Sequence, residues 1–245
     1  MRGRTHCTIG VLTSIQVSLL FKIPISIFSI VISAIFSLLP DLDESNSTIS
    51  NFFLKRNLSK KIYKLIISII NFLIFFISLK INNNFILSSI ITFVSIYIIE
   101  SKLTHKFLRK IFLSLTFLLL SFCLYLANFK IYIIIFILVL ALFPWLKHRG
   151  VSHSVFAIII LYLFLKQIEL LTNICYLSFY GTIGYASHIF LGDIFTRQGV
   201  PIFYPLNNKK ISLGNLRVGT SISNLVEILI VLVLMLLIIY SIIKI

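Results

Sequence analysis

Residues 131–166 read IYIIIFILVLALFPWLKHRGVSHSVFAIIILYLFLK, which is two apolar runs separated by one short polar break. An apolar run of about 16 residues forms a helix of about 24 Å, somewhat shorter than the hydrocarbon core of a bilayer, which is about 30 Å thick. The break carries Pro144 and Gly150, residues typical of the points where one helix ends and the next begins. This stretch therefore predicts two membrane helices joined by a tight turn that holds His148 and His153.

The same pattern extends along the whole chain of 245 residues, which is 59% hydrophobic with a mean hydropathy of +1.07. Soluble domains have an apolar share of about 45–50%. We therefore predict an all-α, polytopic integral membrane helical bundle that forms a single domain over residues 1–245. About nine hydrophobic segments are expected, at 7–21, 24–39, 62–79, 84–100, 111–127, 130–146, 151–166, 173–195 and 222–243. The first two are short, so they form either a tight spanning hairpin or a re-entrant pair.

Alternating the segments across the membrane gives two sets of loops with very different charge. The side that holds the N-terminus carries 17 of the 22 lysines and arginines, and the other side carries five. By the positive-inside rule, the N-terminus and its loops are cytoplasmic and the C-terminus is outside. The net charge of +15 then fits anionic lipid headgroups as partners, and no nucleic acid is expected because no recognition motif accompanies it.

Scarce metal-ligand side chains gather on this same side of the membrane. Four of the five histidines and three of the seven acidic residues fall there, at helix ends. A bilayer protein that collects imidazoles and carboxylates at one depth is expected to build a metal site, with zinc as the first candidate for mixed His and Asp ligands and manganese as the second. The predicted ligands are His6, Asp41, Asp43, His148, His153, His188 and Asp193.

Two of the predicted ligand pairs lie in turns. Asp41 and Asp43 follow Pro40 and either converge to chelate a cation or form a solvated acidic cap. His148 and His153 flank Gly150, which allows the chain to reverse so that both rings face one point. Arg149, between them, suits bidentate contact with a phosphate or carboxylate; the alternative is an interfacial positive charge.

The third pair, His188 and Asp193, ends the eighth segment. These residues are five apart, which is about 140° around an ideal α-helix and not on one face. A single π-type turn, common at functional sites, would align them, or only one of the two is a direct ligand.

Taken in order, three strings resemble the YdjM-type membrane-bound metal-dependent hydrolases. They are LPDLD at 39–43, HRGVSHS at 148–154, and GYASH at 184–188 followed by Asp193, Thr196, Gly199, Val200, Pro201 and Pro205, with His6 matching a histidine near the N-terminus. The resemblance leaves residues 55–140 and the last helix unsupported. It also differs in one spacing, because the family's pattern places the acid four residues after the histidine. The resemblance implies a metal-dependent hydrolase of the bacterial cytoplasmic membrane.

As a hydrolase, the protein would use the metal to make water more acidic and to polarise an ester or phosphoester, with one or two metals bound. Asp43 is expected to act as general base and Arg149 to hold an anionic headgroup or phosphoester substrate. Two other functions stay open: a metal-ion transporter or loading protein, and a non-catalytic membrane protein with a structural metal. His105 fits none of the strings, and residues 196–213 are expected to form a short hairpin or lid.

Overall fold

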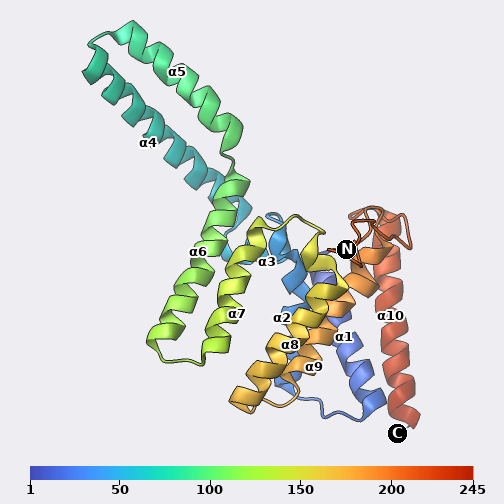
Figure 1. The fold of residues 1–245 in the computed structure, drawn as a ribbon. Helices are drawn as coiled ribbons and strands as arrows, with labels where there is room; N and C mark the ends of the chain where they lie inside the picture. The colour runs from blue at the N-terminus through green and yellow to red at the C-terminus, as the bar shows by residue number, and fades with distance from the viewer. Residues whose placement is uncertain (245) are drawn as a thin grey trace.

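A computed structural model describes residues 1–244, and this part of the chain is helical apart from two isolated β-bridges (Figure 1). The prediction of an all-α protein is therefore confirmed. The α-helices of the described part are α1 (Gly3–Phe21), α2 (Ile27–Leu38), α3 (Thr48–Phe53), α4 (Arg56–Asn82), α5 (Phe85–Lys102), α6 (His105–Leu126), α7 (Ile131–Leu142), α8 (Val155–Thr172), α9 (Leu177–Ser187) and α10 (Ser221–Lys244).

Five of these helices are long and apolar enough to cross a membrane: α4, α5, α6, α8 and α10. A shorter apolar helical stretch runs over Ile131–Trp145. The chain is thus a helical membrane protein, as its composition predicts. That nine segments enter the membrane stays a prediction, because α1, α2 and α9 are not among the five.

Helices α1, α2 and α9 pack closely through small and hydroxyl side chains. Ser33 donates a hydrogen bond to Ser14 (2.6 Å between the Oγ atoms), and Ser18 Oγ donates to Tyr180 Oη at 2.9 Å. A Cβ added to Gly184 would lie 2.5 Å from the carbonyl oxygen of Ser33, so only glycine allows this approach of α9 to α2. Small residues and interhelical hydrogen bonds are the usual means of joining helices in a bilayer.

The link between α1 and α2 is longer than the segment boundaries predict. Helix α2 begins at Ile27, because Ser26 caps it by accepting a hydrogen bond from the backbone N–H of Ser29 at 3.1 Å. Helices α1 and α2 lie side by side. The N-terminal end of α1 and the C-terminal end of α2 reach the ligand cluster. Whether this pair spans the membrane as a hairpin stays a prediction.

Helix α10 is attached to α1 by polar contacts at two levels. Thr5 Oγ1 donates to Glu227 Oε2 at 2.5 Å, and Gln16 Nε2 donates to Ser241 Oγ at 2.9 Å. Glu227 is an ionisable side chain within the apolar helix α10, and it is buried with hydroxyl partners. These contacts give Glu227 a structural role in joining α10 to α1.

The α4–α5 hairpin projects away from the other helices, with its turn at 82–84 far from the turn between α6 and α7 (Figure 1). Alternating the segments across a membrane had placed those two turns on the same side, so the arrangement differs from the prediction there. The physical reason is that α4 and α5 pack mainly on each other, and beyond that mostly on α6. Little packing within the protein fixes the direction of this hairpin.

Candidate metal centre

Short turns next to three helices carry five of the predicted ligands, whereas His6 lies within α1 and His148 in the loop before Val151. The turn Leu39–Asp43 continues α2, the turn Val151–His153 precedes α8, and two further turns continue α9 over His188–Phe195. Apolar neighbours bury the turns that follow α2 and α9 in the hydrophobic core. Leu42 is 1% exposed between the two aspartates, and Ile189, which follows His188, is 0% exposed. Burial of these neighbours holds the backbone that carries the ligands.

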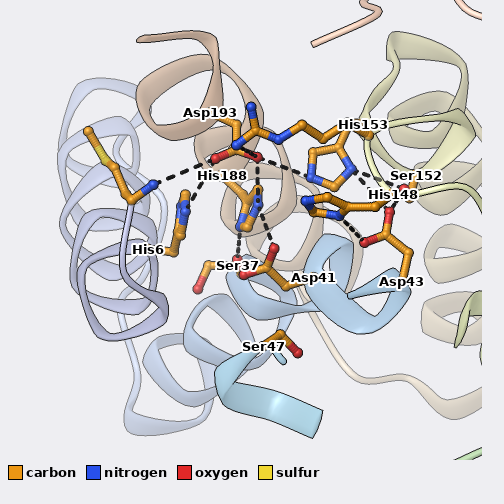
Figure 2. A network of polar contacts seen from close by, with 12 residues as sticks. His6, Ser37, Asp41, Asp43, Ser47, His148, Ser152, His153, His188 and Asp193 are labelled. Carbon is orange, nitrogen blue, oxygen red and sulfur yellow. Dashed lines mark hydrogen bonds and ion pairs between the residues drawn. The ribbon is translucent and has the colours of Figure 1, made fainter. Parts of the chain in front are cut away.

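All seven predicted ligands converge in one cluster, together with Arg149 (Figure 2). Three overlapping groups have ligand atoms within 4.8 Å of one another and could hold a metal ion. The groups are His6, His188 and Asp193; then Asp41, His153 and His188; then Asp43, His148 and His153. The geometry therefore agrees with the predicted convergence, while the ligand roles themselves stay predictions.

Asp193 lies at the centre of the cluster. Its Oδ2 atom is 3.3 Å from His153 Nε2 and 3.8 Å from His188 Nε2. Its Oδ1 atom is 3.7 Å from His6 Nε2. Burial alone would raise the pKa of this carboxyl, but its contacts with His153 and His188 outweigh burial and hold the pKa well below its usual range. Asp193 is thus a carboxylate that faces three imidazoles.

A π-helical turn brings His188 and Asp193 together. The turn runs over His188–Gly192, and it confirms the π-type turn that the five-residue spacing predicts. Gly192 sits against the imidazole of His6, since an added Cβ would lie 2.4 Å from its Cε1 atom. The turn therefore aligns two candidate ligands and leaves room for a third.

The backbone fixes the orientation of the His188 ring. Because the carbonyl oxygen of Ser37 can only accept, His188 Nδ1 carries the proton of their 2.7 Å hydrogen bond. Nε2 then has a free lone pair, and it lies 3.7 Å from Asp41 Oδ1. A backbone carbonyl on the far nitrogen is the usual support of a metal-bound histidine. His6 stacks on this ring with 3.7 Å between centroids.

Several buried polar atoms of the cluster have no hydrogen-bond partner among the residues that the structure describes. They are His6 Nδ1, His153 Nε2, His188 Nε2 and Asp193 Oδ2, the last of which forms an ion pair with Arg149 Nη2 at 3.1 Å. Leaving such groups unpaired is costly, so a binding partner is expected for them. Two ligands of one tetrahedral zinc lie about 3.3 Å apart. The Asp193 Oδ2 separations of 3.3 and 3.8 Å are close to this value, so the donor set fits a metal ion.

Asp43 is instead satisfied by direct hydrogen bonds. Its carboxylate accepts from His148 Nδ1 at 2.7 Å and from Ser152 Oγ at 2.5 Å. Burial alone would raise the Asp43 pKa, but the contacts with His148 and His153 outweigh burial and hold the pKa below its usual range. Burial alone would lower the pKa of His153, but Asp193 and Asp43 raise it to about 9. Without metal, His153 is therefore a cation between two carboxylates.

Arg149 is buried and its guanidinium is largely committed to protein acceptors. Nη2 lies 3.1 Å from Asp193 Oδ2, and Nη1 donates to Thr196 Oγ1 at 2.5 Å and to the Gly199 carbonyl at 3.3 Å. Nε has no partner in the described part of the chain. Arg149 thus holds Asp193 and the start of the loop that follows it.

A cavity of about 1030 Å³ opens beside the cluster. His6, Asp41, His148, Arg149 and Asp193 line it, whereas His153, His188 and Asp43 are buried and do not. His148 is the accessible partner of the pair that it forms with Asp43, since its side chain is 32% exposed and that of Asp43 is 0% exposed.

Two side chains of the site were not singled out from the sequence as functional. Ser152 bonds Asp43 and lies 3.0 Å from His153 Nδ1, and Thr196 accepts from Arg149. Both residues lie in the stretches that carry the family resemblance, so their nearness in sequence to a predicted ligand could have identified them. His105 lies at the start of α6, outside the three candidate groups.

The match to a family model covers the whole chain. The model described as YdjM inner membrane protein matches residues 1–245. No curated protein and no solved structure matches the chain. The chain belongs to the YdjM inner membrane protein family, as the three strings and His6 predicted.

Proposed function

We propose that this YdjM-family protein is a metal-dependent hydrolase whose reaction takes place at the cytoplasmic surface of the membrane. The observation that supports this most directly is the set of buried, unpartnered nitrogen and oxygen atoms around Asp193, among the described residues. Their spacing suits the ligands of one ion, and two of the residues that carry them, His6 and Asp193, line an open cavity.

Two of the three candidate groups contain the unpartnered atoms, and we assign the metal to them. The proposed ligands are His6, Asp41, His153, His188 and Asp193. Mixed imidazole and carboxylate donors favour zinc, with manganese as the alternative. When bound there, the metal would make water more acidic and polarise the oxygen of the bond to be cleaved. The two groups share His188, and their five ligands could bind one ion or two.

The third group supplies a general base. Because the Asp43 carboxylate can only accept, His148 Nδ1 must donate across their 2.7 Å contact, which leaves His148 Nε2 able to take a proton. A buried carboxylate that orients a more exposed histidine is a common arrangement of acid–base catalysts. Asp43, predicted as the base itself, acts in this proposal through His148.

The proposed orientation follows from the charge of the loops. The loop residues that flank the cluster are rich in arginine, and basic loops are retained on the cytoplasmic side. The projecting α4–α5 hairpin affects this argument little, since Lys80 is the basic residue near its turn. The family and the apolar helices place the chain in the inner membrane, and we infer from the charge bias that the N-terminus is cytoplasmic.

The test is metal-dependent hydrolysis by the detergent-purified protein. Carboxyl esters, phosphate monoesters, phosphodiesters and phospholipids are offered before chelation, after chelation, and after zinc or manganese is restored. The proposal expects activity on at least one class, lost on chelation and regained with metal. A folded, metal-loaded protein that cleaves none of these classes would leave a structural metal or a metal-handling role as the better account.

A further inference from the structure

The residues that line the cavity beside the ligand cluster form two sets of different chemistry, which we call its two walls. One wall is made of the candidate metal ligands and His148. The other is made of the start of α1, residues 44–48 and two separate stretches of the loop between Asp193 and α10. The cavity volume of about 1030 Å³ is at the upper end of the range of ligand pockets. It can accept a group much larger than a water molecule or a metal ion.

The second wall carries four exposed arginines, Arg2, Arg4, Arg197 and Arg217. Within residues 1–244, no salt bridge involves any of these four. Apart from the ligands Asp41 and Asp193, the acidic lining residue is Glu44, which accepts from the Asn46 backbone N–H at 3.1 Å. The second wall therefore has a surplus of positive charge.

Backbone pairing brings two of the arginines together although they are distant in sequence. Arg197 N donates to the Leu216 carbonyl at 3.0 Å, beside a β-bridge between Thr196 and Leu216. Arg217 is therefore the residue directly after Leu216, whose carbonyl accepts the hydrogen bond from Arg197. Arg149 fixes the base of this loop through Thr196, so the loop is tied to the ligand cluster.

The N-terminus of α1 adds to the positive charge of this wall. The helix has 19 residues, no side chain caps its first turn, and that turn contains no acidic residue. The first amide N–H groups of a helix lack intrahelical partners and attract anions. Arg2, Gly3 and Arg4 of this turn line the cavity. Arg149, which is 6% exposed and also lines the cavity, has an unpartnered Nε atom in the described part of the chain.

We propose that this arginine wall binds a dianionic phosphate group, so that the substrate of the site is a phosphate monoester. A phosphate carries a charge of about −1.5 to −2 and three acceptor oxygens, which suits several guanidinium groups and helix N–H groups at once. A carboxylate has two oxygens and would leave most of this wall unused. This inference rests on the proposed hydrolase for its role as substrate, although phosphate binding itself can be measured alone.

The experiment measures binding of inorganic phosphate to the full-length, metal-loaded protein in detergent by calorimetry. The test variant is Arg197→Gln with Arg217→Gln, and the matched control is Lys209→Gln with Lys210→Gln on the same loop, since neither lysine lines the cavity. Loss of two charge-assisted contacts is expected to weaken phosphate binding about tenfold or more in the test variant. The control variant should bind as the unmodified protein does, and metal content should be equal in all three.

A second variant, Arg197→Lys with Arg217→Lys, controls for a folding defect. It keeps the positive charge and should retain part of the affinity for phosphate. Equal phosphate affinity in the test and control variants, or no phosphate binding by the metal-loaded protein, would overturn the inference. Hydrolysis of a neutral ester that phosphate does not inhibit would also overturn it, while leaving the proposed hydrolase intact. Arginine-dependent phosphate binding without any hydrolysis would support the anion site and count against the hydrolase.

The two sources of a phosphate monoester are separated by competition. Vesicles of phosphatidic acid in phosphatidylcholine and a soluble sugar phosphate are compared as inhibitors of phosphate binding. Inhibition by either supports the arginine wall as a phosphate site, and the stronger inhibitor identifies the source. Inhibition by neither would contradict it.

Discussion

His188 donates a hydrogen bond from Nδ1 to the backbone carbonyl of Ser37 across 2.7 Å, and this contact ties the end of α9 to the end of α2. The bond determines which ring nitrogen of His188 has a lone pair. That nitrogen, Nε2, lies within 3.8 Å of both Asp41 Oδ1 and Asp193 Oδ2. A histidine whose free nitrogen is directed at two carboxylates in a buried site is oriented to bind a cation.

The packing of Gly192 against His6 gives the first prediction. An added Cβ would lie 2.4 Å from His6 Cε1 and 2.6 Å from Nδ1, so Gly192→Ala must displace the ring. Displacing a ligand without removing it is expected to lower zinc affinity about 10- to 100-fold, measured by competition with a chelator. Phe190→Ala, in the same π-turn at a side chain that is 39% exposed, is the matched control and should bind zinc normally. Unchanged affinity in Gly192→Ala would remove His6 from the ligand set.

The Asp43–His148 pair gives the second prediction. If His148 is the base and Asp43 orients it, His148→Ala and Asp43→Asn should each lower kcat about 10²- to 10⁴-fold while metal content stays normal. The pH–rate profile of the remaining activity should also lose the fall in rate at acidic pH that protonation of a general base causes. Loss of metal in both variants would instead show that the pair ligates the ion, as the sequence predicted.

The third prediction concerns the pH dependence of the metal-free protein. Asp193 and Asp43 raise the pKa of His153 to about 9, above its ordinary value of 6.5. A pKa that is raised by folding adds stability that is fully present below the unfolded value and is lost as pH rises through the folded value. The chelated protein should therefore have a lower Tm at about pH 10 than at about pH 6.

His153→Gln is the control for this effect, because it removes the titrating group and should flatten the Tm between those two pH values. A chelated wild type whose Tm stays constant or rises with pH would show that His153 is neutral between its two carboxylates.

Much of this site could be predicted from the sequence because its ligands are rare residues in an apolar chain. The spacing of His188 and Asp193 left two alternatives open, a π-type turn or a single direct ligand, and the chain contains a π-type turn there. The partners of Arg149 could not be predicted, because they lie on a loop whose folding depends on a β-bridge between Thr196 and Leu216, residues that are 20 apart. The positions of Arg197 and Arg217 in the cavity depend on the same bridge.

The direction of the α4–α5 hairpin could not be predicted from the sequence either. Hydropathy identifies α4 and α5 as apolar helices of membrane-crossing length, and the structure agrees. Their orientation depends on packing against other helices. Of the most apolar 18 residues, 11% are buried in α4 and 6% in α5, so most of the surface of these helices contacts no other part of the protein. The charge of the loops indicates which loops lie on the same side of the membrane only where successive helices cross it in alternating directions.

The most direct test of the metal centre is elemental analysis of the protein purified in detergent without added metal, beside His153→Ala, His188→Ala and the outlying His105→Ala. We predict about one or two equivalents of zinc or manganese in the wild type and in His105→Ala, and loss of that metal in the other two variants. A folded wild type that contains no metal and takes up neither zinc nor manganese when they are added would contradict the account. Equal metal content in all four proteins would contradict it as well.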